Sequence, residues 1–236
     1  MHLLAFESSA KSASVALLRD GVLVAEYMQN SGQTHSRTLL KMAEDLLNNC
    51  DLTIEDVDAV AAAIGPGSFT GLRIGLAAAK GLAWGRQIPC VGVSTLEAMA
   101  RSAAMADGIY VCCMDARRQQ VYNAVFSVAG GKLLRLREDR AISIEELEQD
   151  LASLSGALIL VGDGAGLCHS TMNENSRLIL APEHMRMQRA SGVALAALEQ
   201  LKEGTVPPVG EVTLNYLRLS QAERERALRL EQEGGK

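Results

Sequence analysis

One pattern of secondary structure occurs twice along the chain, and this repetition constrains the fold more than any other feature. Residues 3–27 read as an apolar strand ending in Glu7, a turn, a second strand and, after the hairpin at 20–21, a third strand. Residues 109–136 repeat this order, with Asp115 at the end of the first strand and a Gly-Gly hairpin before the third. We therefore expect two similar lobes.

The first copy continues in the order helix, strand, glycine turn and helix. The apolar periodicity predicts a helix over 35–49, a strand over 57–64 and a second helix over 71–85, with Gly65-Pro66-Gly67 between the last two. A short strand at 90–93 and a helix opened by Ser94 or Thr95 complete this copy.

The second copy follows the same order. Ser143 and Glu146 have the spacing of a capping box for a helix over 144–154, and a strand at 157–161 leads into the glycine turn at 162–166. A helix over 191–203 is expected to close the second lobe.

Three antiparallel strands followed by helix, strand and helix, stated twice, are the plan of the actin-like fold. The predicted class is α/β: two actin-like, ribonuclease H-like lobes, each a mixed five-stranded sheet with flanking helices. The predicted lobes are 1–106 and 107–206. Residues 207–236 form a tail with the run NYLR and a charge-rich helix at 222–232, and we expect this tail to fold back on the first lobe.

The Gly-Pro-Gly turn places hydroxyl groups where a strand meets a helix. Ser68 and Thr70 fall at the helix N-terminus, where free N–H groups and the helix dipole attract anions, and Arg73 lies one turn inside. An ordinary N-cap and tight turn produces the same pattern. Arg73 has two possible partners, a phosphate or a carboxylate at a subunit boundary.

The two strand-ending acids, Glu7 and Asp115, are expected to face each other across the cleft between the lobes, where enzymes of this fold hold a metal and phosphates. Polar strand ends without a ligand are the alternative. The candidate phosphate or nucleotide site thus comprises these residues: Glu7, Ser8, Gly67, Ser68, Thr70, Arg73 and Asp115.

Composition limits the classes of partner. The chain has 236 residues, 48% of them hydrophobic, so it is long enough for a sizeable core. Only 3% are aromatic and the net charge is −5, which argues against direct binding of nucleic acid. Five cysteines without C-x-x-C spacing predict reduced, buried thiols. With no secretory signal or membrane span expected, a cytoplasmic location is predicted.

Seven motifs occur in this order: LLAFESS, THSRTLL, GPGSFTGLRIGLAAAKGLA, GVSTLEA, MDARRQQVY, VGDGA and NYLR. With them the chain resembles the TsaB (YeaZ) family over essentially its whole length. The resemblance implies a non-catalytic, actin-like subunit in the synthesis of threonylcarbamoyladenosine, the modified adenosine next to the anticodon of tRNAs that read codons beginning with A. It implies a catalytic paralogue, TsaD, as partner, and a small ATPase, TsaE.

The resemblance also implies a homodimer in isolation, contact with tRNA only through the complex, and no cofactor beyond ATP or ADP at a partner interface. The residues agree with a non-catalytic role, because the four histidines, His2, His35, His169 and His184, form no closely spaced metal-binding pair. Where the family has Asp, this chain has Glu7. An ATP-dependent phosphotransferase is the alternative function, and a metallopeptidase a third.

Two predicted helices of the first lobe suit assembly. The helix at 35–49 has a broad apolar face, and the helix at 71–85 carries small residues every four positions. Packing on the lobe's own sheet explains such a ridge equally well. The resemblance implies a bundle with the matching helices of a partner, formed by His35, Leu39, Leu40, Ala43, Leu46, Leu47, Gly71, Leu72, Gly75, Leu76, Ala79, Lys80 and Ala83.

Overall fold

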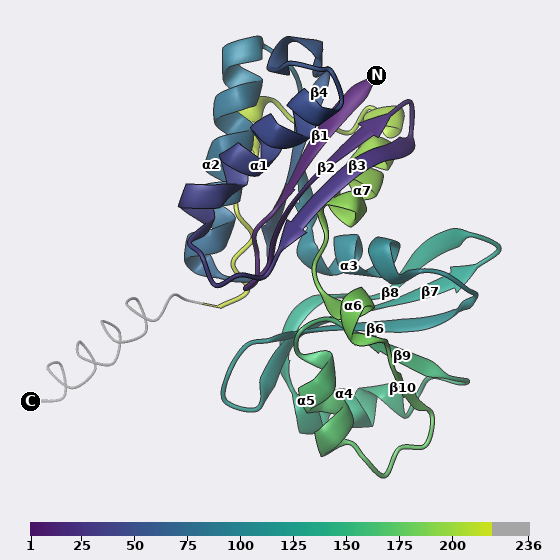
Figure 1. The fold of residues 1–236 in the computed structure, drawn as a ribbon. Helices are drawn as coiled ribbons and strands as arrows, with labels where there is room; N and C mark the ends of the chain where they lie inside the picture. Colours follow the sequence, from purple (N-terminus) through teal and green to yellow (C-terminus); the bar gives the residue numbers. More distant parts are fainter. Residues whose placement is uncertain (219–236) are drawn as a thin grey trace, which may run out of the picture.

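Two five-stranded mixed sheets form the centres of two lobes in the computed structural model, which describes residues 1–218 (Figure 1). The order is β3-β2-β1-β4-β5 in the first sheet and β8-β7-β6-β9-β10 in the second. In each, three strands are antiparallel and two more are added in parallel, as predicted. The strands are β1 (His2–Glu7), β2 (Ala13–Arg19), β3 (Val22–Gln29), β4 (Ala59–Gly65), β5 (Cys90–Ser94), β6 (Gly108–Asp115), β7 (Gln120–Ala129), β8 (Lys132–Ser143), β9 (Leu158–Val161) and β10 (Leu178–Leu180).

The helices lie close to their predicted positions. The capping box is confirmed: Glu146 N–H donates to Ser143 Oγ, and Ser143 N–H donates to Glu146 Oε2, each over 3.1 Å. The strand after the first helix begins later than expected, at Ala59, because a 3₁₀ turn over Ile54–Asp56 precedes it. The helices are α1 (His35–Asn49), α2 (Phe69–Arg86), α3 (Thr95–Ala103), α4 (Ile144–Leu151), α5 (Ala165–Thr171), α6 (Glu183–Arg186) and α7 (Ala190–Glu203).

Helices cover both faces of the first sheet. Alternate side chains of β1 point to opposite sides of the sheet, so this apolar strand contributes to a core on each face. Leu4 and Phe6 pack in a core with α1 and α2. Leu3 and Ala5 pack on the other side in a core with α7. The first lobe is therefore a three-layer structure whose central strand is apolar from Leu3 to Phe6, between the half-buried His2 and the buried Glu7.

The two lobes exchange one helix each. Helix α3 follows the first sheet in sequence but packs its apolar side chains against the second sheet, whereas α7 contacts β1, β2, β4 and β5 of the first (Figure 1). The prediction that the helix at 191–203 closes the second lobe is wrong. The two helices cross closely, since a Cβ at Gly192 would overlap the carbonyl oxygen of Ala98. The predicted boundary between the two lobes, after residue 106, stays a prediction.

After α7 the chain stays on the first lobe. Val212 is buried in its core, and Asn215 N–H donates to the carbonyl oxygen of Ile64 over 2.8 Å. The predicted helix at 222–232 lies outside the described residues. All five cysteines are free thiols, four buried and Cys50 half-buried. Within 1–218, no helix combines the length and the apolar character needed to cross a bilayer.

Candidate functional site

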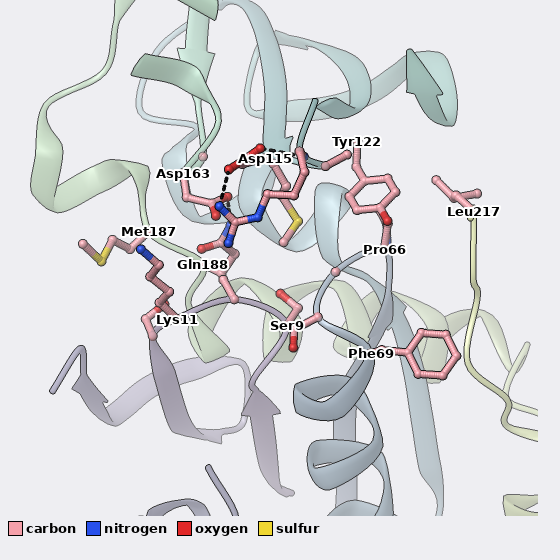
Figure 2. A pocket seen from close by; sticks show the side chains of 18 of the residues that line it. Ser9, Lys11, Pro66, Phe69, Asp115, Tyr122, Asp163, Met187, Gln188 and Leu217 are labelled. Atoms are coloured by element: carbon pink, nitrogen blue, oxygen red, sulfur yellow. Dashed lines mark hydrogen bonds and ion pairs between the residues drawn. The ribbon is translucent and has the colours of Figure 1, made fainter. Parts of the chain in front are cut away.

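A cleft of about 740 Å³ separates the lobes and is lined from both (Figure 2). The first lobe contributes the turn after β1, at 9–12, and the turn before α2, at 66–70. The second contributes the end of β6, the turn after β9 and the segment around α6, and the tail residues 215–218 complete the lining. Of the candidate phosphate-site residues, the lining contains Gly67, Ser68, Thr70 and Asp115.

The turn before α2 is held against the turn after β1. Ser68 N–H donates to the carbonyl oxygen of Ser9 over 2.6 Å, and the Ser68 hydroxyl caps α2 by accepting from Gly71 N–H over 3.2 Å. Gly67 has φ +155°, and a Cβ there would lie 2.6 Å from the Ser9 carbonyl oxygen. Glycine is required at this point because the two backbones touch.

Glu7 is fully buried and does not line the cleft. Its Oε1 accepts from Ser9 N–H over 2.6 Å, while Oε2 has no hydrogen-bond partner among the described residues. Burial raises the pKa of this carboxyl to about 7, the hydrogen bonds from Ser9 and Ser8 oppose the rise, and the charge of Asp163 adds to it.

The second lobe brings Asp115 and Asp163 to the cleft (Figure 2). Asp115 Oδ1 accepts from Arg117 N–H over 2.7 Å, and the Arg117 guanidinium lies 3.3 Å from Oδ2. Gln188 Nε2 donates to Asp163 Oδ1 over 2.9 Å. The pKa of Asp163 is raised, chiefly by its partial withdrawal from water, with a smaller contribution from Asp115.

The expected arrangement of Glu7 opposite Asp115 across the cleft is therefore wrong. The acid whose charge acts on Glu7 is Asp163, and Glu7 itself lies behind the wall formed by the turn after β1. Within residues 1–218, no group of three or more His, Cys, Asp or Glu side chains has an arrangement that could hold a metal ion.

Ser8 and Arg73 also lie outside the cleft lining. The buried Ser8 hydroxyl donates to the carbonyl oxygen of Gly71 over 2.9 Å. Arg73 Nε donates to the Tyr216 hydroxyl over 3.1 Å, and its guanidinium carbon stands 4.3 Å over the Phe69 ring. Among the described residues, the partner of Arg73 is thus neither a carboxylate nor a backbone carbonyl but an aromatic pair.

Sequence reasoning missed several lining residues. The hydroxyls of Ser9 and Ser12 line the cleft, are buried and have no hydrogen-bond partner among the described residues. Asp163 had a usable signal, because it follows the strand of the second copy that corresponds to β4. Gln188 had none. The run NYLR at 215–218 was noted as a motif, but nothing in its sequence indicated that it reaches the cleft. The remaining missed charged side chains are Lys11, Arg117, Glu183, Arg186 and Arg218.

The predicted partner surface is mostly internal. Glycines 71 and 75 face the Ser8 residue, because a Cβ at either position would overlap an oxygen of Ser8. His35 is half-buried, its Nε2 2.8 Å from the Ala10 carbonyl oxygen, and Lys80 donates to the carbonyl oxygen of Gly210 over 3.2 Å. The ridge thus packs on its own lobe, whose two cores bury these apolar members of the set: Leu39, Ala43, Leu46, Leu47, Leu76, Ala79 and Ala83 in one, and Leu72 in the other.

A different face of α2 is exposed. Along this outer face lie Arg73, Ala77, Gly81 and Trp84, and Trp84 is 67% exposed. On α1, Leu40 is 52% exposed and is the member of the predicted surface that reaches solvent most fully. Large apolar side chains that reach solvent in this way are candidates for an interaction surface.

Comparisons with known proteins identify the family to which this chain is similar. The sequence profile of a family described as TsaD, tRNA N6-adenosine threonylcarbamoyltransferase, matches residues 25–224. The tRNA threonylcarbamoyladenosine biosynthesis protein TsaB of Bacillus subtilis is 31% identical over 94% of this chain and 96% of its own. TsaB of Escherichia coli is 31% identical over 92% and 95%.

A solved structure agrees with the fold. The structure of YeaZ from Pseudomonas aeruginosa superposes with a TM-score of 0.75 at 24% identity, covering 92% of this chain and 99% of that one. The family profile matches more than half of the chain, and the relatives named TsaB are similar along nearly all of it. The chain belongs to the TsaB family of tRNA threonylcarbamoyladenosine biosynthesis proteins.

Proposed function

We propose that this chain is a non-catalytic subunit that binds and activates a TsaD-like catalytic relative, which threonylcarbamoylates the adenosine next to the anticodon of tRNAs reading codons that begin with A. The observation that carries the proposal is the full-length relationship to proteins named for threonylcarbamoyladenosine biosynthesis. A supporting observation is that the strand-ending acid of the first lobe, Glu7, is buried behind the cleft wall and is not presented to a ligand.

The outer face of α2 is the surface we propose for the partner. Ala77 and Gly81 are exposed and small, so a facing helix can approach closely, and Trp84 supplies apolar area on the same face of α2. Leu40 supplies a further exposed apolar side chain on the neighbouring helix α1. The TsaD profile matches this chain, so a TsaD-like partner shares the fold and has helices equivalent to α1 and α2. Equivalent surfaces pair around a twofold or near-twofold axis, and a second copy of this chain is expected to use the same face.

The test is the substitution Ala77→Arg, which puts a long cation on the outer face. Ala79, on the inner ridge, is fully buried and is unsuitable, because an arginine there would disrupt the core. We expect Ala77→Arg to abolish co-elution with the TsaD-like partner, and to fail to restore threonylcarbamoyladenosine, measured by mass spectrometry of tRNA nucleosides, in cells depleted of this protein. Ala152→Arg, at an exposed position in the second lobe, is the matched control.

If both variants restored threonylcarbamoyladenosine, the partner would bind a surface other than the outer face of α2. Unchanged threonylcarbamoyladenosine after verified depletion would overturn the function itself. The alternative, an ATP-dependent phosphotransferase, is separated by titrating the isolated chain with ATP and magnesium: a kinase binds them alone, whereas the proposed subunit does not. Binding of ATP or ADP at a shared interface, and a role for a TsaE-like ATPase, stay predictions.

A further inference from the structure

Residues 212–218 run along the first lobe as an extended segment, here called the C-terminal strap. Val212 is buried and anchors its start, and Asn215 is hydrogen-bonded to Ile64 at the end of β4. Gly65, with φ +129°, passes so close that a Cβ there would overlap the carbonyl oxygen of Asn215. The strap is therefore seated on the backbone immediately before the turn that opens α2.

An aromatic clamp joins the strap to α2. The rings of Tyr216 and Phe69 are stacked, with centroids 4.0 Å apart and an interplanar angle of 12°. Arg73 completes the clamp through its hydrogen bond to the Tyr216 hydroxyl and its position over the Phe69 ring. Phe69 and Arg73 both belong to the first turns of α2, and Arg73 also stands on the exposed outer face of that helix.

The end of the strap reaches the second lobe. The Arg218 guanidinium donates to the carbonyl oxygen of Ala116 over 2.5 Å. Ala116 opens the loop between β6 and β7, in which Arg117, Arg118 and Gln119 have φ values of 67°, 57° and 57°. Three consecutive non-glycine residues in the left-handed region are unfavourable unless neighbouring contacts hold them. The Arg218 bond is one such contact.

The strap thus crosses the cleft from one lobe to the other. Its last four residues line the cleft, and Figure 2 shows Leu217 on the side of the cleft that also holds Phe69. Arg73 forms no ion pair within residues 1–218, so its charge is available to a carboxylate presented at the outer face. One side chain therefore belongs both to the proposed partner surface and to the clamp on the strap.

We propose that the C-terminal strap couples the outer face of α2 to the relative position of the lobes. A partner that covers Arg73 holds the clamp closed, and the closed clamp holds Arg218 on the second lobe, which orders the 116–119 loop and fixes the cleft. This inference rests on the proposed function, since the partner is the TsaD-like relative. Because coupling is reciprocal, loosening the strap weakens partner binding by the factor by which the partner stabilises the strap.

Hydrogen–deuterium exchange of the full-length chain, with and without the purified TsaD-like partner, tests the coupling. In the wild type we expect the partner to slow exchange at least fivefold in 212–218 and in 116–120, although the latter loop is on the other lobe. In Arg218→Ala the slowing at 116–120 disappears, and partner affinity falls severalfold. Arg218→Lys, which keeps a donor, restores part of both effects.

Arg118→Ala is the matched control, because it removes an exposed arginine from the same loop without touching the strap contact. Tyr216→Ala opens the clamp from the other end and is expected to reproduce Arg218→Ala. Partner binding by the wild type without slower exchange at 116–120, or equal slowing in Arg218→Ala, would overturn the coupling and leave the proposed function intact. Failure of the wild type to bind the partner would overturn both.

Discussion

At the scale of single residues, the environment of Glu7 decides what this acid does. An acid at the end of a central strand is well placed for a ligand, yet here its carboxyl lies behind the first-lobe turn with one oxygen unpartnered among the described residues. The pKa of about 7 means that the group is largely protonated below neutral pH. A neutral carboxylic acid in an apolar setting is a structural group.

The pH dependence of stability follows from this pKa. The folded value is above the ordinary 4.5, so the stabilising effect of the neutral carboxyl is full below pH 4.5 and is lost as pH rises through 7. Glu7→Gln removes the titration. We expect its free energy of unfolding, relative to the wild type, to rise by about 2–3 kcal/mol between pH 5 and pH 8, measured by urea denaturation. A difference independent of pH would contradict the assignment.

At the scale of elements, α2 has two faces of small residues with different roles. Gly71 and Gly75 lie against Ser8, and their lack of a side chain lets the helix approach the turn after β1. Gly81 is on the opposite side, and a Cβ added there would have no neighbouring atom within 4 Å. Glycine is therefore required for packing within the lobe on one face, whereas on the other face no atom of the lobe opposes a side chain.

Paired alanine substitutions measure this difference. Gly71→Ala is expected to lower the free energy of unfolding by about 1–3 kcal/mol, because the new methyl group meets the Ser8 backbone. Gly81→Ala is expected to raise it by up to about 1 kcal/mol through helix propensity alone. Chemical denaturation of both variants gives the comparison, and similar effects at the two positions would show that the inner contact is not tight.

At the scale of the whole molecule, the exchanged helices make the lobes interdependent. Helix α7 covers one face of the first sheet, and α3 covers one face of the second. Ser94 Oγ, at the start of α3, also donates to Asp139 of β8 over 2.6 Å. Neither lobe closes its core with residues from its own half of the sequence, so the two are expected to unfold together.

A truncated chain tests this interdependence. Residues 1–106 contain every strand of the first sheet but lack α7, so the β1 and β2 side chains that α7 covers become exposed. We expect this fragment to aggregate or to elute as a broad species without a cooperative thermal transition, whereas the full chain unfolds in one transition. A monomeric fragment with a sharp transition, followed by circular dichroism and size-exclusion chromatography, would show that the first lobe is autonomous.

Local signals in the sequence predicted most elements. The capping box at Ser143, the cap at Ser68 and the strand that ends in Glu7 depend on neighbours within a few residues, and all three are present. The cleft was predicted only in part, because Ser9 and Asp163 come to line the same cleft only through the packing of separate segments. Spacing identifies the residues that share a face, and it does not identify what covers that face.

The sequence by itself determined the twofold repetition, the strand and helix positions and the relationship to the TsaB family, because periodicity, caps and turns are local and the motifs are continuous. Tertiary structure alone decided that α3 and α7 change places, that the ridge at Gly71 and Gly75 faces inward, and that the tail spans the cleft to Ala116. These outcomes depend on which apolar surfaces pack together although they are far apart in the sequence, and only the packing of the whole molecule determines those contacts.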